Sequence, residues 1–352
     1  MNDIVKILPN FKKFNDYISN VKDNISPIML SGLTDSGKVH FAYSTYFYAE
    51  KPICIITYNE LQAKKIIRNL EYFENNINYF PKKEILAYDY LAESKDITYS
   101  RIACLNEIHK KQAKIIVTTI EAVSQKIIPE DVLYKNILEL KIGDVINLEE
   151  IKQKLVLLGY ERQDVVENKS EFSVRGGIID VAISEKQGIR IELWGDEIDS
   201  IRTFDINTQR SLEKRENIKI YPAHEFLLDK PLEEVAKDIQ DQRDKEEILE
   251  GNFTNKIDKY WNKFYNNPDN TFIDYIKDNY IIFIDEVSKI KARSENVIKD
   301  TKLLMQNLVE KKRYIPELLE KIEDYIEFLD RIKSIQTIYL ENKDIGFVDK
   351  QS

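Results

Sequence analysis

Three short apolar segments near the start of the chain constrain its fold most strongly. Residues 27–31, 53–57 and 114–119 are almost continuously hydrophobic, and residues 60–73 and 99–111, which lie between them, have helical character. Strands that are apolar on both faces and alternate with helices are typical of a parallel sheet covered on both sides. The sequence therefore predicts an α/β core in its first part.

Composition limits the class of protein. The 352 residues are 43% hydrophobic and 11% aromatic, which excludes a disordered chain. Basic residues number 52 and acidic residues 61, so the net charge is −9. An acidic chain argues against non-specific nucleic-acid binding as the main activity, although this composition does not exclude a local basic groove.

Cysteine and histidine are scarce. Cys54 and Cys104 are the two cysteines, and three histidines are scattered along the chain. This excludes a disulfide framework and a cysteine-based zinc site, and we predict no metal site. The sequence holds no apolar run of 18 residues and does not begin with a signal peptide, so we predict a cytoplasmic chain without membrane contact.

The pattern changes near residue 131. An amphipathic helix is expected over 147–159, with Gly159 at its end. Segments with period-two alternation then follow, separated by turn residues, over 171–175, 177–183, 189–194, 197–204 and 217–221. This pattern predicts an antiparallel α+β module. Beyond Pro222 the chain is mostly helical and charged, apart from an apolar strand over 280–284.

A near-complete phosphate loop follows the first apolar segment. Residues 32–38 fit G-x-x-x-x-G-K, in which backbone N–H groups and the lysine bind phosphates. Val39 stands where a working loop has a hydroxyl for Mg²⁺, and an aliphatic side chain cannot bind a hard cation. Paired carboxylates after the strand at 280–284 resemble the acidic motif of such enzymes. We predict a vestigial nucleotide site without hydrolysis, made of Gly32, Gly37, Lys38, Asp285 and Glu286.

Several stretches in fixed order carry a family resemblance. They cover residues 158–162, 171–180, 190–202, 204–205 and 221–226. In these stretches the chain strongly resembles the N-terminal region of the bacterial transcription-repair coupling factors (Mfd), a region itself similar to the repair protein UvrB. The resemblance extends over the whole chain and is strongest from about 155 to 226.

Three features favour the coupling factors over UvrB. Val39 interrupts the phosphate loop, which UvrB keeps intact. UvrB inserts a long DNA-clamping hairpin at a place where this chain has only about ten residues, from Asp89–Leu91 to Tyr99–Arg101. Residues 222–226, Pro-Ala-His-Glu-Phe, also follow the coupling-factor pattern.

The resemblance implies three parts. A degenerate RecA-like domain 1A is expected over 1–130, completed by a returning strand near 279–286 and by the C-terminal tail. Domain 2, the UvrA-binding module, is expected over 131–220, and a mostly helical part similar to domain 1B over 221–345. The predicted fold class is thus α/β, with an inserted antiparallel α+β domain and a helical third part.

The resemblance also implies a function. The expected role is that of a non-catalytic adaptor, which binds UvrA and recruits nucleotide excision repair to stalled RNA polymerase. Complete coupling factors add domains for RNA polymerase and DNA, including a translocase that uses ATP and Mg²⁺. We expect this chain to be an N-terminal fragment without those domains, and so without a cofactor of its own.

The expected UvrA contacts lie in domain 2. Arg175, Arg190 and Trp194 match the family's contact positions, with Glu192 as an addition. On a strand, residues 190, 192 and 194 share one face, and the aliphatic residues between them face the core. Exposed arginine beside exposed tryptophan is typical of an interface hot spot. The competing interpretation treats Trp194 as a core residue and the arginines as solvated charges.

Two other functions remain open. An ATP-binding DNA-repair protein could still use Lys38, Asp285 and Glu286, and a nucleic-acid-binding module would need a local basic patch. No catalytic constellation is assembled from the sequence. His224 is expected to be a hydrogen-bonded residue at a domain junction.

Overall fold

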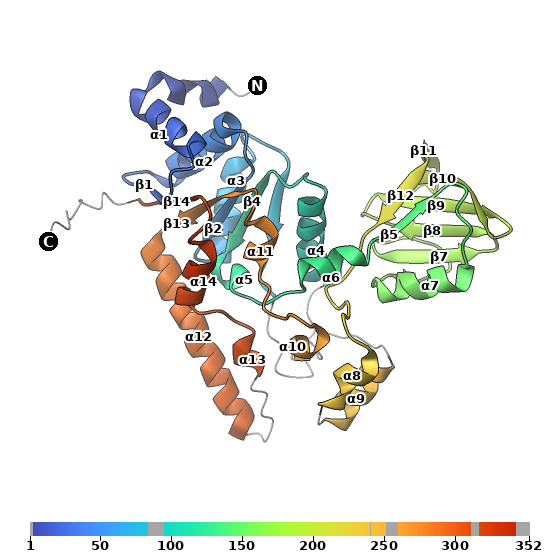
Figure 1. Cartoon of the computed structure of the whole chain (residues 1–352). Coiled ribbons are helices and arrows are strands. Elements are labelled where there is room, and N and C mark those ends of the chain that lie inside the picture. Colours follow the sequence, from blue (N-terminus) through green and yellow to red (C-terminus); the bar gives the residue numbers. More distant parts are fainter. Residues whose placement is uncertain (1–2, 84–94, 240, 251–259, 311–316, 343–352) are drawn as a thin grey trace. The chain divides into compact units, whose positions relative to one another are not determined.

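The computed structural model describes residues 3–83, 95–239, 241–250, 260–310 and 317–342 (Figure 1). The chain divides into two compact units. Unit 1 consists of Met1–Ile127 and Val235–Ser352, and unit 2 consists of Ile128–Glu234. Unit 2 is therefore an insertion in the sequence of unit 1.

Unit 1 is built on a sheet of six strands within the described residues, and every pair of neighbours is parallel. In spatial order the strands are β1 (Ile28–Leu30), β14 (Thr337–Leu340), β13 (Ile281–Asp285), β2 (Ile53–Thr57), β4 (Ile115–Thr119) and β3 (Ile77–Phe80). The central strands β13, β2 and β4 are buried at every position. This is why each of them reads as a continuous apolar segment.

Helices cover this sheet on both sides (Figure 1). The helical segments of the described unit 1 are η1 (Asp3–Asn10), α1 (Lys12–Lys22), α2 (Asp35–Ala49), α3 (Glu60–Leu70), α4 (Lys95–His109), α5 (Ile120–Val123), α9 (Gln242–Leu249), α10 (Trp261–Phe264), α11 (Phe272–Ile276), α12 (Val287–Glu310), α13 (Glu317–Glu320) and α14 (Tyr325–Ile332). Part of the core joins the first helices to the sheet, through residues that include Val21, Ala42, Ile55, Val117 and Phe283.

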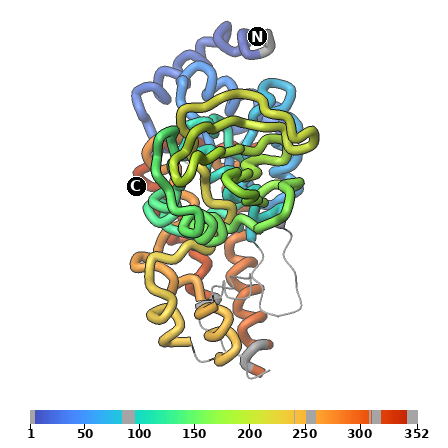
Figure 2. The backbone as a smooth tube through the Cα atoms, turned by 90° about the vertical axis from the view of Figure 1, so that its right-hand side faces the viewer, coloured from blue at the N-terminus to red at the C-terminus, as the bar shows by residue number. Residues whose placement is uncertain are grey.

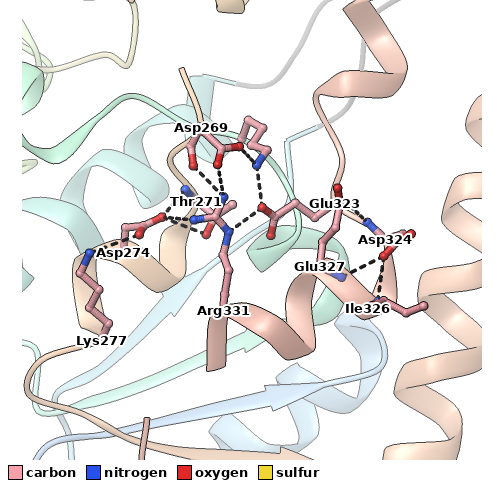
Figure 3. A network of polar contacts seen from close by, with 10 residues as sticks. Asp269, Thr271, Asp274, Lys277, Glu323, Asp324, Ile326, Glu327 and Arg331 are labelled. Atoms are coloured by element: carbon pink, nitrogen blue, oxygen red, sulfur yellow. Dashed lines mark hydrogen bonds and ion pairs between the residues drawn. The ribbon is translucent and has the colours of Figure 1, made fainter. Parts of the chain in front are cut away.

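A polar network links segments of unit 1 that are distant in sequence (Figure 3). Arg331 on α14 lies between three acidic residues: Nε donates to Glu323, Nη1 donates to Asp274 at 2.9 Å, and Nη2 lies 3.2 Å from a carboxylate oxygen of Asp269. Lys126 also contacts Asp269 and Glu323. These ion pairs hold the segments before α11 and α14 together.

Unit 2 contains a second sheet of six strands among the described residues. In spatial order they are β11 (Ser211–Arg215), β10 (Glu197–Asp205), β9 (Gln187–Trp194), β8 (Ile178–Ala182), β7 (Glu171–Arg175) and β6 (Glu161–Arg162). The order follows the sequence in reverse, and the pairs are antiparallel except β6 with β7. The green-to-yellow tube of Figure 2 traces these hairpins back and forth.

The connections of unit 2 include short helices and a two-stranded ribbon. The helices are α6 (Glu130–Lys135), α7 (Leu148–Leu157) and α8 (Leu232–Lys237), the last of which crosses the unit boundary. The ribbon pairs β5 (Leu138–Lys141) with β12 (Asn217–Ile220). The sequence placed residues 217–221 in the main antiparallel sheet. They pair with β5 instead, because Leu138 and Leu140 supply a matching alternation of buried residues.

Helix α7 begins and ends as the sequence predicts. The Asn147 side chain accepts hydrogen bonds from the N–H groups of Glu149 and Glu150, which caps the first turn. Gly159 follows the helix with φ +89°, in the left-handed region that favours glycine. A ring nitrogen of His224 lies 2.9 Å from the carbonyl oxygen of Leu157, so His224 is hydrogen-bonded as predicted, although both residues lie within unit 2.

The predicted fold class is confirmed: a parallel sheet with helices, an antiparallel-sheet module and further helices are all present. The region 221–345 contributes two strands, β13 and β14, to the sheet of unit 1 in addition to its helices. The prediction that the chain lacks the hairpin insertion concerns mainly residues 84–94, which lie outside the described residues. Residues Tyr99–Arg101, which follow, belong to α4. Among the described residues, no helix combines the length and the hydropathy needed to cross a bilayer.

Candidate functional site: a polar face on the antiparallel sheet

One face of the unit 2 sheet carries the predicted contact residues. Cross-strand pairing places Asp180 opposite Arg190, and Arg190 opposite Arg202. A second row of cross-strand neighbours runs from Arg175 through Ile178 and Glu192 to Ser200. A third row, at the end of the sheet, contains Trp194, Glu197 and Val145. We call these three rows the polar face. The opposite face is apolar and buried, through Phe172, Ile179, Val181, Ile189, Ile191 and Ile201.

Asp180 organises the first part of this face. Its carboxylate accepts hydrogen bonds from Nε of Arg190 at 2.7 Å, from Nη2 of Arg190 at 2.9 Å and from Nη2 of Arg175 at 3.0 Å. Asp180 itself is only 1% exposed. One buried carboxylate therefore holds two guanidinium groups, and charge-assisted bonds of this kind are stronger than neutral ones.

Arg190 is held on a second side by an aromatic ring. Its guanidinium carbon lies 4.8 Å from the ring centroid of Phe204, which is fully buried. The hydrogen bond to Asp180 raises the pKa of Arg190 above its usual value, although burial acts in the opposite direction. Arg190 is thus permanently charged and fixed in orientation.

Glu192 and Arg202 form a second ion pair. The Glu192 carboxylate accepts from Nη2 of Arg202 at 2.5 Å and from the Ser200 hydroxyl at 2.7 Å. Both side chains remain about one-third exposed. Glu192 therefore contributes to the face as one half of a pair and not as an isolated carboxylate.

Trp194 ends strand β9 and projects into solvent. It is 85% exposed, which differs from the interpretation of Trp194 as a core residue. The hairpin turns immediately after it at Gly195, whose φ is +63°, and Trp194 pairs with Glu197 across the turn. Val145, bridged to Glu197 and 77% exposed, extends the apolar part of the face.

The four predicted contact residues therefore share one surface. With a rise of about 3.3 Å per residue, Arg190 and Trp194 lie about 13 Å apart along β9. Arg175 lies two strands away from β9 at the end of β7, before the Gly176-Gly177 turn. An exposed indole next to fixed guanidinium groups can bind a partner that offers an apolar pocket and carboxylates.

The sequence interpretation missed two residues of this face, Asp180 and Arg202. Asp180 is the single charged residue in the apolar segment 178–182, and it aligns with Arg190 once the hairpin is drawn. Arg202 follows from the same alternation on β10. Both could be found from the register of the hairpins, but not from the spacing within one strand.

A second candidate site, the phosphate-loop segment, lies in unit 1. Gly32 has φ +76°, and the Thr34 hydroxyl accepts from the N–H of Gly37 at 3.2 Å to cap α2. Helix α2 begins at Asp35, inside the segment 32–38 that fits the phosphate-loop pattern. The loop between β1 and α2 is therefore short, since residues 35–37 already belong to the helix.

Lys38 is paired inside the protein. Its Nζ lies 2.7 Å from Oδ1 of Asp285 and also contacts Glu286, and its side chain is 4% exposed. Burial acts to lower the pKa of Lys38, but the hydrogen bonds to these two carboxylates raise it above its ordinary value. The five predicted residues of the vestigial site are therefore positioned by β1, α2 and the end of β13.

Further contacts surround the two carboxylates. Asp285 accepts from the Thr57 hydroxyl at 2.8 Å, and Glu286 accepts from the backbone N–H of Asn342 at 2.8 Å. Burial acts to raise the pKa of Glu286, but the bonds from Lys38 and Asn342 lower it below 4.5. The two carboxylates are paired with the lysine that a nucleotide phosphate would need. Val39 is buried, and its aliphatic side chain offers no metal ligand. Among the described residues, no group of three or more His, Cys, Asp or Glu is arranged to hold a metal ion.

Comparisons with known proteins match unit 2 to one family and most of the chain to another group of proteins. The family model described as the UvrB interaction domain matches residues 138–226, within unit 2. The transcription-repair-coupling factor of Bacillus subtilis (strain 168) is 28% identical over 344 residues, which cover 90% of this chain and 29% of that protein. The coupling factor of Staphylococcus epidermidis (strain RP62A) is 28% identical over 310 residues, which cover 80% of this chain and 26% of that protein.

A third relative gives the same result. The transcription-repair-coupling factor of Staphylococcus aureus (strain MRSA252) is 26% identical over 321 residues, which cover 84% of this chain and 28% of that protein. The chain spans less than a third of the length of these relatives. In sequence the chain is similar to the N-terminal region of the bacterial transcription-repair coupling factors, and its residues 138–226 match the family model of the UvrB interaction domain.

Proposed function

We propose that this chain is an adaptor in transcription-coupled DNA repair, and that the polar face of unit 2 binds UvrA. The family that the sequence resembles uses its domain 2 for that contact, and residues 138–226 match the UvrB interaction domain. The observation that carries the proposal is Trp194, which is 85% exposed on the same face of the sheet as two arginines held by one carboxylate. By binding UvrA, the chain would recruit nucleotide excision repair to a stalled RNA polymerase.

The composition of the polar face supports a protein partner. A large indole loses little conformational entropy when it is buried, and tryptophan and arginine are enriched among residues that dominate binding energy. Arg175 and Arg190 present planar donors to a carboxylate of the partner. Glu192 and Arg202 are ion-paired within the sheet and would form part of a polar rim.

In this proposal unit 1 is a scaffold and the chain is not an enzyme. Lys38 is neutralised by Asp285 and Glu286, which disfavours the alternative of an ATP-binding repair protein. We assign contacts with RNA polymerase and DNA, and the use of ATP and Mg²⁺, to parts of the coupling factors outside the matched region. The role requires a cytoplasmic location, where bacterial DNA is transcribed.

The test is a calorimetric titration of the chain with purified UvrA. Because Trp194 is exposed in the free chain, Trp194→Ala should leave the unfolding temperature unchanged and weaken binding at least about 10-fold. The double reversal Arg175→Glu/Arg190→Glu should weaken binding by about 2 kcal/mol or more, which is roughly 30-fold.

The matched control reverses two other basic residues of unit 2. Arg215→Glu/Lys219→Glu makes the same charge change on exposed side chains outside the polar face, and we expect it to bind nearly as the wild type does. Absence of binding by the wild-type chain would exclude the adaptor role. Normal binding by Trp194→Ala would show that UvrA contacts another surface.

A further inference from the structure

Asp180 is buried beneath the two arginines that the proposed function assigns to UvrA. It lies on β8, directly opposite Arg190 on β9, and it is 1% exposed. It accepts three hydrogen bonds from the two guanidinium groups, between 2.7 and 3.0 Å. We infer that Asp180 is a positioning residue, which fixes Arg175 and Arg190 in one orientation so that their free N–H groups meet a partner carboxylate.

The geometry of Arg190 supports this inference. Nε and Nη2 bond to Asp180, and the ring of Phe204 lies beside the guanidinium carbon. Nη2 also reaches the side-chain oxygen of Gln209 at 3.4 Å. In the described part of the chain Nη1 makes no hydrogen bond, so two N–H donors remain for a partner.

Arg175 complements Arg190. It reaches the same carboxylate with Nη2 alone, and its side chain is 50% exposed against 17% for Arg190. One arginine is thus nearly fixed, and the other extends towards solvent from a common anchor. A bidentate site for a carboxylate needs such pre-orientation, because an unconstrained arginine loses rotamer entropy on binding.

Charge and orientation predict opposite effects when Asp180 is changed. Asp180→Asn removes one negative charge and so makes the polar face more positive by one unit, which should favour an acidic partner. If the arginines acted only as charges, this variant would bind UvrA faster and more tightly at low salt. If Asp180 acts by orientation, the variant binds more weakly despite the added charge. The inference rests on the proposed function and requires the second result.

The experiment compares three variants of the full chain with the wild type, using UvrA affinity at low and high salt. We expect Asp180→Asn to bind at least about 10-fold more weakly at both salt concentrations. Asp199→Asn makes the same charge change at an exposed position of β10, and we expect unchanged or slightly tighter binding. Arg190→Lys keeps the charge and leaves Asp180 paired, but it removes the planar fork and should also weaken binding.

A spectroscopic readout separates orientation from simple folding. In the free wild-type chain the Nε–H of Arg190 should give a sharp, slowly exchanging NMR signal, which Asp180→Asn should lose while the backbone amide signals of β8 and β9 remain. Wild-type or tighter UvrA binding by a folded Asp180→Asn variant would overturn the inference. If Asp180→Asn does not fold, wild-type affinity in Arg190→Lys, which lacks the planar fork that Asp180 would orient, would overturn it instead.

Failure of the inference is distinct from failure of the proposed function. The adaptor role fails if the wild-type chain does not bind UvrA or if Trp194→Ala binds normally. The positioning role fails if Trp194→Ala weakens binding while Asp180→Asn does not.

Discussion

At the scale of single residues, Lys38 shows how a phosphate loop becomes a structural element. Its ammonium group contacts two carboxylates from the end of β13, and all three side chains are at least nine-tenths buried. A buried cation is tolerated when it is paired and hydrogen-bonded, and Asp285 and Glu286 are further satisfied by Thr57 and Asn342. The carboxylates thus occupy the place of the anion that the loop would otherwise bind.

We predict that Lys38→Met destabilises unit 1 by about 3 kcal/mol, because it leaves two buried carboxylates without their cation. Trp261 lies in unit 1 and is 5% exposed, whereas Trp194 is already in solvent. Tryptophan fluorescence during urea denaturation therefore follows unit 1. A variant as stable as the wild type at neutral pH would contradict the structural role of this ion pair.

The same variant has a characteristic pH dependence. In the wild type the pKa of Glu286 lies below its ordinary value of 4.5, so the stability it contributes is present above pH 4.5 and is lost as the pH falls through the lowered pKa. In Lys38→Met, Glu286 loses the cation that lowers its pKa and takes up a proton more readily in the folded state. The stability difference between the two proteins should therefore shrink as the pH falls from 7 to below 4.5.

At the scale of elements, the end of α7 depends on one close contact. Gly159 has φ +89°, and a Cβ at that position would lie 2.4 Å from Cδ2 of His224. His224 in turn approaches the carbonyl oxygen of Leu157 in the last turn of the helix. The helix end and the segment after β12 thus fix each other, which places α7 within unit 2.

Gly159→Ala should destabilise unit 2 by at least about 2 kcal/mol, from the left-handed backbone and from the collision with His224. In a His224→Ala background the collision is absent, and the cost should fall to about 1 kcal/mol, from the backbone alone. A calorimetric double-mutant cycle measures this difference. Equal costs in both backgrounds would mean that the ring moves aside freely.

At the scale of the whole molecule, the proposed binding face lies in unit 2, which is one continuous segment inserted into unit 1. Its six-stranded sheet, its β5–β12 ribbon and the contact between His224 and Leu157 all lie within Ile128–Glu234. Unit 1 needs both chain ends, because β13 and β14 lie between β1 and β2 in its sheet. All strands of unit 2 therefore lie in one continuous segment, whereas the strands of unit 1 come from two segments.

We predict that residues 128–234, expressed alone, fold and bind UvrA with an affinity close to that of the full chain. Every strand pair of the polar face is internal to this segment. Dispersed amide signals in a two-dimensional NMR spectrum would establish folding, and calorimetry would give the affinity. A folded segment with strongly reduced affinity would indicate that unit 1 supplies part of the UvrA contact.

The sequence by itself determined which segments form strands, where a strand is buried on both faces or where apolar and polar residues alternate along it. The segment 53–57 is a strand with the predicted bounds, and 171–175 and 197–204 are strands of an antiparallel sheet, because their periodicity records which faces are buried. The same alternation indicated that residues 190, 192 and 194 share a face. Local information of this kind requires no knowledge of neighbouring strands.

Only the tertiary structure decided which elements become neighbours. Three features depend on how strands pair. They are the pairing of β12 with β5, the position of β14 and β13 between β1 and β2, and the position of Asp180 under Arg175 and Arg190. Likewise, the sequence grouped Lys38 with Asp285 and Glu286 as one vestigial site, but only the fold shows that the two carboxylates pair directly with its ammonium group. Contacts between residues distant in sequence leave no periodic signal, so their geometry emerges only when the chain is folded.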